Sequence, residues 1–123
     1  MLEKKMIDQT RTVEKPWGGE LIWAETKDYV GKILFIKKDN RLSRQYHEKK
    51  EETIFVKTGI LGLEIGQGEE LQQLALNAGQ TYHVIPGTIH RFCAPYGDVE
   101  LIEVSTPHLE DVVRLEDDYS RSK

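Results

Sequence analysis

The chain has 123 residues, of which 38% are hydrophobic and 31% charged, and this composition fits one soluble domain rather than two. No apolar run approaches the roughly 18 residues of a transmembrane helix, and the first residues are charged and polar, so we expect no membrane partner and no secretory signal peptide. The single cysteine excludes a disulfide framework and suits the cytoplasm, while a formal charge of −4 argues against nucleic-acid binding.

Turn signals built from glycine, asparagine and proline recur at short intervals, and the segments between them predict strands. Glycine and asparagine tolerate positive φ angles, while proline cannot donate a hydrogen bond to a sheet. Strands are expected, in chain order, at residues 21–24, 29–37, 53–57, 61–65, 71–76, 81–85, 91–94 and 99–104. About eight strands at this spacing predict an all-β sandwich or barrel.

Two of these segments indicate which of their faces are buried. Between residues 61 and 65, leucine and isoleucine alternate with glycine and glutamate, which is the period of a strand with one buried face. Residues 33–36 are all apolar, so we expect that strand to be buried on both faces.

No stretch has a clear helical period of 3.6 residues. The best helix candidate, residues 109–113, could equally form a strand. The first dozen residues offer little to bury, so residues 1–12 are expected to be disordered and residues 13–123 to form a single domain.

Charge is unevenly distributed along the chain. Residues 37–50 hold six basic and two acidic side chains, a local charge of +4, whereas residues 98–118 hold eight acids and one base, a local charge of −7. One interpretation is that both stretches are solvated sheet edges. The other is that the basic stretch attracts an anionic substrate such as a sugar phosphate.

The first candidate ligand cluster is Gln45, His47 and Glu52. Gln45 and His47 are two residues apart, so on a strand both side chains leave the same face. An odd spacing would place Glu52 on the opposite face of an unbroken strand. The polar residues 48–51 are therefore expected to form a tight turn or bulge that returns Glu52 to the same side.

A second cluster follows downstream, where Pro86 and Gly87 predict a turn just before His90. This turn would fold His90 back over the sheet toward the first cluster. One amide oxygen, two imidazoles and one carboxylate could then converge, a set that suits a divalent metal ion. Zinc is favoured, with manganese, iron, nickel or cobalt as alternatives.

Four sequence motifs carry a resemblance to a known family. They are Lys-Pro-Trp-Gly at 15–18, Leu-Ser-Arg-Gln-Tyr-His at 42–47, Gly-Thr-Ile-His-Arg at 87–91 and Val-Arg-Leu-Glu-Asp-Asp-Tyr at 113–119. With the spacing of the candidate ligands, they resemble the cupins, and most closely the cupin domain of type II phosphomannose isomerases, which is usually fused to a mannose-1-phosphate guanylyltransferase. The resemblance implies a double-stranded β-helix, or jelly-roll barrel.

The resemblance also implies a metal-dependent aldose–ketose isomerase that interconverts mannose 6-phosphate and fructose 6-phosphate, with a glutamine, here Gln45, as the first metal ligand. In such a reaction the metal stabilises an enediolate while a base moves a proton between C2 and C1. The base is left open among Glu48, His83 and Glu103.

The phosphate of such a substrate needs a cationic anchor, for which Arg44, Lys50 and Arg91 are the candidates. Arg91 follows His90 directly, so without a bulge it points out of the barrel. The chain departs from the family pattern at Glu48, Lys49 and Thr53, which replace histidines, and at Lys50, which replaces an arginine.

Two alternative functions remain open because of these departures. One is a non-catalytic cupin that binds a metal or a carbohydrate, and the other is a different metal-dependent cupin enzyme, such as a dioxygenase or an epimerase. Small cupins commonly pair through a sheet, so we expect a homodimer with a small-molecule sugar phosphate as ligand.

Overall fold

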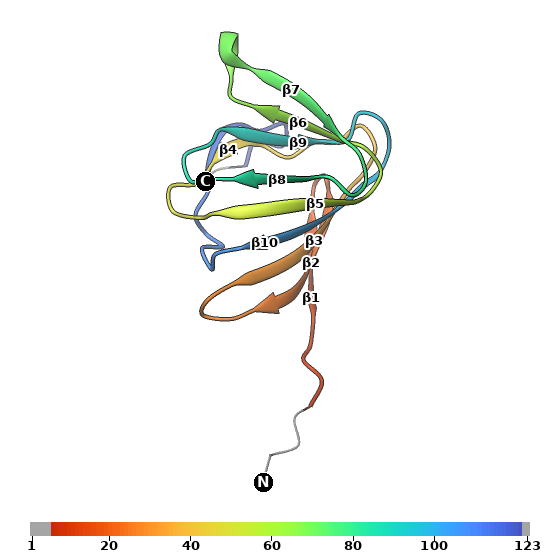
Figure 1. Cartoon of the computed structure of the whole chain (residues 1–123), viewed down its shortest axis with the longest axis vertical. Coiled ribbons are helices and arrows are strands. Elements are labelled where there is room, and N and C mark those ends of the chain that lie inside the picture. The colour runs from red at the N-terminus through yellow and green to blue at the C-terminus, as the bar shows by residue number, and fades with distance from the viewer. Residues whose placement is uncertain (1–5, 122–123) are drawn as a thin grey trace.

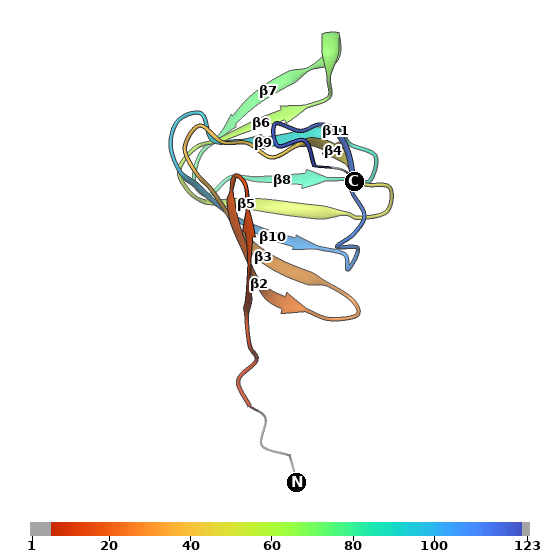
Figure 2. The same cartoon turned by 180° about the vertical axis from the view of Figure 1, so that it is seen from behind.

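The computed structural model describes residues 6–121, which form two antiparallel sheets (Figures 1 and 2). The six-stranded sheet has the order β1-β2-β3-β10-β5-β8 and the five-stranded sheet the order β11-β4-β9-β6-β7. The elements are β1 (Arg11–Lys15), β2 (Gly18–Glu25), β3 (Val30–Ile36), β4 (Arg44–Tyr46), β5 (Glu52–Thr58), β6 (Leu61–Ile65), a 3-10 turn (Gly68–Glu70), β7 (Gln72–Leu76), β8 (Thr81–Val84), β9 (His90–Cys93), β10 (Val99–Ser105) and β11 (Val113–Glu116).

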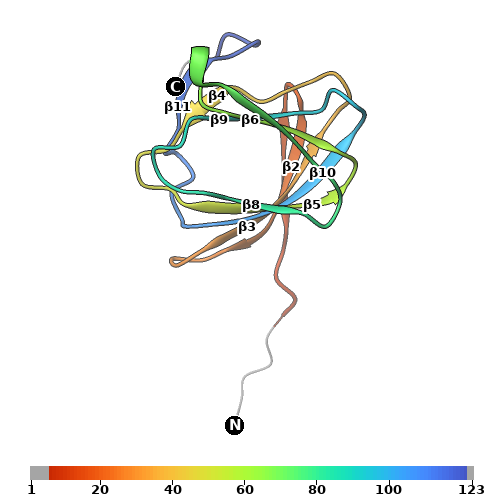
Figure 3. The same ribbon diagram turned by 45° about the horizontal axis from the view of Figure 1, so that its top comes forward.

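The two sheets face each other and enclose the core, as the view in Figure 3 shows. Leu61 and Leu63 of β6 are fully buried between the sheets, so the predicted alternation is confirmed. Trp17, in the turn between β1 and β2, also belongs to this core. Burying a side chain of this kind stabilises the fold by about 1.5–3 kcal/mol, so the inward faces of the strands hold the barrel closed.

The prediction that residues 33–36 are buried on both faces is wrong. Leu34 and Ile36 are 2% and 1% exposed, but Phe35 between them is 39% exposed. The outer face of the six-stranded sheet has no further layer over it within residues 6–121. Apolar residues on this face therefore remain in contact with water.

All eight predicted strands are present, and three further strands, β1, β4 and β11, were not predicted. These three are short and largely polar, and β1 and β11 lie at sheet edges, where apolar alternation is weak. The helix alternative for residues 109–113 is wrong, because this segment is a turn that leads into β11. The domain boundary predicted at residue 13 lies inside β1, which begins at Arg11, while residues 1–5 lie outside the described part of the chain.

In the described residues, no helix has the length and hydropathy needed to cross a membrane.

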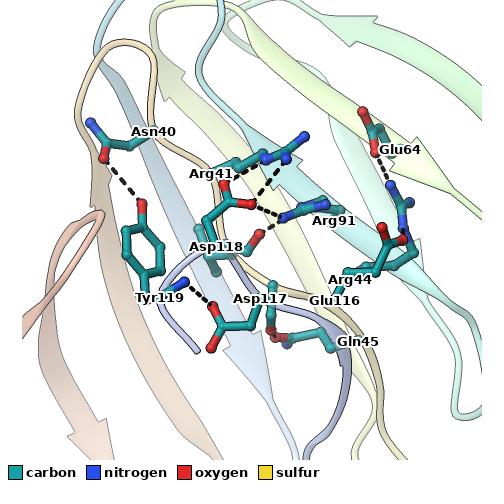
Figure 4. A network of polar contacts seen from close by, with 12 residues as sticks. Asn40, Arg41, Arg44, Gln45, Glu64, Arg91, Glu116, Asp117, Asp118 and Tyr119 are labelled. Carbon is teal, nitrogen blue, oxygen red and sulfur yellow. Dashed lines mark hydrogen bonds and ion pairs between the residues drawn. The ribbon is translucent and has the colours of Figure 1, made fainter. Parts of the chain in front are cut away.

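Part of the basic stretch is ion-paired with part of the acidic stretch. Arg41 Nε lies 2.7 Å from Asp118 Oδ2, and Arg91 Nη2 lies 3.1 Å from Asp118 Oδ1 (Figure 4). Asp118 thus joins the chain after β11 to β9 and to the segment before β4. These contacts fix the C-terminal segment against the outer face of the five-stranded sheet.

Arg44 makes a second set of contacts on the same face. Its guanidinium pairs with Glu116 of β11, lies 2.6 Å from Glu64 Oε1 of β6, and donates to the carbonyl oxygen of Gly66 at 3.1 Å. The side chain of Arg44 is only 7% exposed, so these partners compensate a buried charge. The residue is occupied in structural contacts.

Candidate metal centre

Three buried side chains converge inside the barrel. His47 follows β4 directly, Glu52 opens β5 and His90 opens β9, and one potential ligand atom from each lies within 4.8 Å of the others. Glu52 Oε1 is 3.5 Å from His47 Nε2 and 3.3 Å from His90 Nε2. The bend predicted between His47 and Glu52 is present at residues 48 and 49, and it returns Glu52 to the same side as His47.

Hydrogen bonds fix which nitrogen of each ring faces the cluster. His47 Nδ1 lies 2.6 Å from the carbonyl oxygen of Asp111, and His90 Nδ1 lies 2.8 Å from that of Thr88. A carbonyl oxygen can only accept, so both Nδ1 atoms carry hydrogen, and in the neutral ring each Nε2 atom presents a lone pair. Within the described residues neither Nε2 atom has a hydrogen-bond partner, although both are buried.

This arrangement fits a divalent metal ion. Imidazole Nε2 atoms held by Nδ1–H bonds to carbonyl groups, together with one carboxylate oxygen, are a donor set that zinc, manganese or iron accepts. Two buried lone pairs without partners would otherwise cost free energy. His47, Glu52 and His90 are therefore the candidate ligands.

The second oxygen of Glu52 is held by a lysine. Lys50 Nζ lies 3.1 Å from Glu52 Oε2 and 3.2 Å from Glu103 Oε2, and all three side chains are buried. Burial alone would lower the pKa of Lys50, but the carboxylates of Glu103 and Glu52 raise it above its ordinary value. Lys50 therefore stays charged between the two carboxylates.

The two carboxyl groups respond in opposite directions. Burial would raise the pKa of Glu52, but the His47 and His90 rings and the Lys50 ammonium group hold it well below its ordinary value. Burial raises the pKa of Glu103, and the neighbouring Glu52 raises it further against the opposing effect of Lys50. Glu52 is thus the anionic group suited to a metal, and Glu103 is the carboxyl group with the raised pKa.

Gln45, the fourth predicted ligand, lines the same cavity. Its Oε1 atom accepts a hydrogen bond of 2.6 Å from Ser43 Oγ, which leaves this oxygen a second lone pair. A role for Gln45 as a metal ligand stays a prediction.

The bend that carries His47 toward Glu52 is held by Asp111. Its carboxylate accepts hydrogen bonds from the backbone N–H groups of Glu48, Lys49 and Lys50, at 3.0, 2.7 and 2.8 Å. The backbone oxygen of Asp111 is also the acceptor for His47. One residue therefore fixes both the bend and the orientation of a candidate ligand.

Asp111→Ala is expected to weaken metal binding about 10-fold or more, because the bend loses its acceptor while the backbone bond to His47 can remain. A Zn²⁺ titration against a competing chelator measures the change, with the exposed neighbour Glu110→Ala as control. Equal affinities of the Asp111→Ala variant and the wild type would show that the bend holds its shape without this carboxylate.

The loss of thermal stability caused by Asp111→Ala in metal-free protein is expected to depend on pH. Burial would raise the pKa of Asp111, but the three backbone N–H groups lower it to about 2. An unfolded aspartate titrates near pH 4, so the stabilisation by Asp111 is complete above that pH and is lost as the pH falls through about 2. The difference in Tm between wild type and Asp111→Ala should therefore shrink below pH 4.

Two of the candidate ligands, His47 and Glu52, border a cavity of about 90 Å³ inside the barrel, and His90 Nε2 lies 3.3 Å from Glu52 Oε1. Among the residues predicted to bind substrate or act as a base, Lys50 and Glu103 line this cavity. The lining also contains cationic side chains that were not predicted, namely Lys15, Lys32, Arg114 and Arg121. The alternation of Lys32 with Leu34 and Ile36 along β3 was a signal that this lysine points inward.

Four of the predicted site residues lie away from the cavity. Glu48 is exposed on the bend, and His83 faces solvent on β8, where its Nε2 atom lies 2.5 Å from Glu51 Oε2. Arg44 and Arg91 point to the outer face of the five-stranded sheet, as strand alternation requires. None of the four lines the cavity in the described part of the chain.

The fold and the inward His/Glu/His set define a cupin, a double-stranded β-helix with a candidate metal centre. Residues 2–117 match the family model described as mannose-6-phosphate isomerase C-terminal. The chain belongs to this family, because the match extends over nearly all of its 123 residues. No curated protein matches the chain in a sequence comparison.

Solved structures with the same fold are distant in sequence. KdgF from Halomonas sp. is 19% identical with a TM-score of 0.69, and the alignment covers 81% of this chain and 86% of KdgF. The capsular polysaccharide assembling protein CapF from Staphylococcus aureus is 15% identical with a TM-score of 0.78, covering 89% of this chain and 32% of CapF. Oxalate decarboxylase from Bacillus subtilis, which has Mn(II) centres, is 13% identical with a TM-score of 0.71, covering 85% of this chain and 29% of the enzyme.

Proposed function

We propose that the chain is a metal-dependent aldose–ketose isomerase that interconverts mannose 6-phosphate and fructose 6-phosphate. The observation that carries this proposal is the buried Lys50–Glu103 pair, which shares one cavity with His47 and Glu52 of the candidate metal centre. Membership of the mannose-6-phosphate isomerase C-terminal family supports the choice of substrate.

In this proposal each residue at the site has a separate task. His47, Glu52 and His90 hold the divalent ion, with Gln45 as the predicted fourth ligand. A bound divalent ion supplies Lewis-acid polarisation of sugar oxygens. Glu103 removes the proton from C2 of the sugar and returns it to C1, a role that suits a buried carboxyl group with a raised pKa. Lys50 holds the carboxylates of Glu52 and Glu103 in place.

The departures from the family pattern mostly fall outside the cavity. Glu48, Lys49 and Thr53 replace histidines, but none of them is among the residues that line the cavity in the described chain. Thr53 follows Glu52 on β5, so its side chain leaves the opposite face of the strand. The residues that surround the candidate metal centre therefore support the isomerase proposal despite these replacements.

Wild-type protein loaded with Zn²⁺ or Mn²⁺ and incubated with mannose 6-phosphate in deuterated water is expected to give fructose 6-phosphate with deuterium at C1. Removal of the C2 proton by a base allows that proton to exchange with solvent. Glu103→Gln should lower the rate by about 100-fold or more, because an amide cannot take up the proton. Nuclear magnetic resonance of the product measures both the label and the rate.

Glu48→Gln is the matched control, since Glu48 is an exposed carboxylate outside the cavity. Unlabelled product would indicate a hydride shift, in which Glu103 does not act as a base. Absence of product from several hexose and pentose phosphates, with stoichiometric metal bound, would overturn the isomerase proposal.

A second candidate is a non-catalytic cupin that binds a metal ion, and the size of the cavity favours it. About 90 Å³ holds roughly three water molecules, which is less than a hexose phosphate requires. The isomerase proposal therefore requires the cavity to widen when the sugar enters. Metal binding without turnover in the deuterium experiment would select this second candidate.

A further inference from the structure

Three of the half-buried residues that line the cavity are cationic, and we call the half-buried part of the lining the mouth. Lys15 ends β1, Arg114 lies on β11, and Arg121 follows β11 in the C-terminal segment. Lys15 is distant in the sequence from the two arginines, yet all three side chains line the cavity that His47 and Glu52 border. The mouth therefore gathers positive charge from both ends of the domain.

Deeper in the cavity, each lysine is paired with carboxyl groups. Lys32 Nζ lies 3.3 Å from Glu20 Oε1, and Lys50 lies between Glu52 and Glu103. The excess of positive charge is therefore found at the mouth rather than next to the candidate metal ligands.

Arg121 is held in a fixed orientation by Asp117. The Nε and Nη2 atoms of Arg121 donate to the Asp117 carboxylate at 2.9 and 3.1 Å, and the backbone N–H of Arg121 donates to it at 2.8 Å. Two of the five guanidinium N–H groups are used in this way, so others remain for a ligand. The side chain of Arg121 is 23% exposed, so a ligand in the cavity can reach it.

Arg114 lies close enough to Arg121 for the two charges to interact. Burial lowers the pKa of Arg114, and the Arg121 guanidinium lowers it further, while Asp117 raises it. The other carboxylate at the mouth, Asp111, already accepts three backbone hydrogen bonds. An anion at the mouth would relieve the repulsion between the two arginines.

We infer that Lys15, Arg114 and Arg121 bind the phosphoryl group of a phosphorylated sugar, whose other end points toward His47 and His90. The inference rests on the proposed function. Guanidinium groups bind phosphate oxygens in a bidentate manner, and a lysine adds a further charge-assisted hydrogen bond. This site replaces Arg44 and Arg91, the anchors expected from the sequence, whose guanidinium groups are occupied by Glu116, Glu64 and Asp118.

Calorimetric titration with mannitol 6-phosphate tests the site without turnover, because this ligand has no carbonyl group to isomerise. Arg121→Gln and Arg114→Gln should each weaken its binding about 10- to 100-fold. The metal content of both variants should equal that of the wild type. Binding of mannitol, which lacks the phosphoryl group, should be unchanged by either substitution.

Arg11→Gln is the matched control, since Arg11 is an exposed arginine paired with Glu25 and lies outside the cavity lining. Lys15→Gln is a further test that does not disturb the contacts of the C-terminal segment, and it should also weaken binding of mannitol 6-phosphate. Unchanged binding by folded Lys15→Gln and Arg121→Gln proteins would overturn the inference, as would equal affinity of the wild type for mannitol and mannitol 6-phosphate.

The results separate this inference from the proposed function. Loss of mannitol 6-phosphate binding in the arginine variants, in a protein that isomerises no sugar phosphate, would support the phosphoryl site and overturn the isomerase. Isomerisation of mannose 6-phosphate with a KM that Arg114→Gln and Arg121→Gln leave unchanged would support the isomerase and overturn the phosphoryl site.

Discussion

His47→Ala is expected to lower the affinity for Zn²⁺ by roughly 100-fold or more while the barrel stays folded. The substitution removes one of the buried Nε2 donors, and the remaining Glu52 and His90 hold an ion far less tightly. The core does not depend on the metal, because the two sheets also bury apolar side chains that do not line the cavity, such as Leu61, Leu63 and Val99. Metal analysis of protein purified without a histidine tag measures the loss, and circular dichroism measures the fold.

His83→Ala is the control for this experiment, because His83 is an exposed histidine paired with Glu51 and lies outside the cavity lining. It should retain the wild-type metal content. Stoichiometric metal in His47→Ala would contradict the ligand assignment, whereas an unfolded His47→Ala protein would make the site structural.

Lys50→Met should lower the free energy of unfolding of the metal-free protein by about 3–5 kcal/mol. The substitution leaves Glu52 and Glu103 buried near each other without the ammonium group that lies 3.1 and 3.2 Å from their oxygens. Adding Glu103→Gln removes one of the two negative charges that repel each other, so the double variant should be more stable than Lys50→Met alone. Urea unfolding in the presence of a chelator measures the free energy of unfolding of the wild type, of Lys50→Met and of the double variant.

Lys57→Met provides the comparison with an exposed pair. Lys57 Nζ lies 3.5 Å from Glu100 Oε2 and its side chain is 48% exposed, so its loss should cost less than about 1 kcal/mol. Equal effects of Lys50→Met and Lys57→Met would contradict the view that Lys50 compensates buried charge.

The fold could be predicted because most strands carry apolar residues between clear turn signals. The strand at residues 61–65 shows this best, since its leucines are buried as their alternation requires. β4 could not be found in this way, because its buried Arg44 is compensated by Glu64 and Glu116, which are distant in the sequence. On β3 the error was the reverse, because apolar side chains such as Phe35 were predicted to be buried but lie on the uncovered face of the sheet.

The candidate metal centre could be predicted because spacing along strands fixes which side chains share a face. His47, Glu52 and His90 converge as this spacing required, while Gln45 stays a prediction. The proposed phosphoryl-binding side chains could not be predicted from local charge. Arg44 lies in the basic stretch at residues 37–50 but pairs with distant carboxylates, and Arg91 likewise pairs with Asp118. The homodimer also stays a prediction.

The contacts of Asp111 determine when the site can be completed during synthesis. Ribosomes make the chain from its N-terminus, so the ten strands β1 to β10 are synthesised before residue 111. Until Asp111 emerges, the N–H groups at residues 48–50 and the Nδ1–H of His47 lack the acceptors they have in the folded domain. A nascent chain that stops before residue 111 therefore carries the candidate metal ligands but not the framework that orients them.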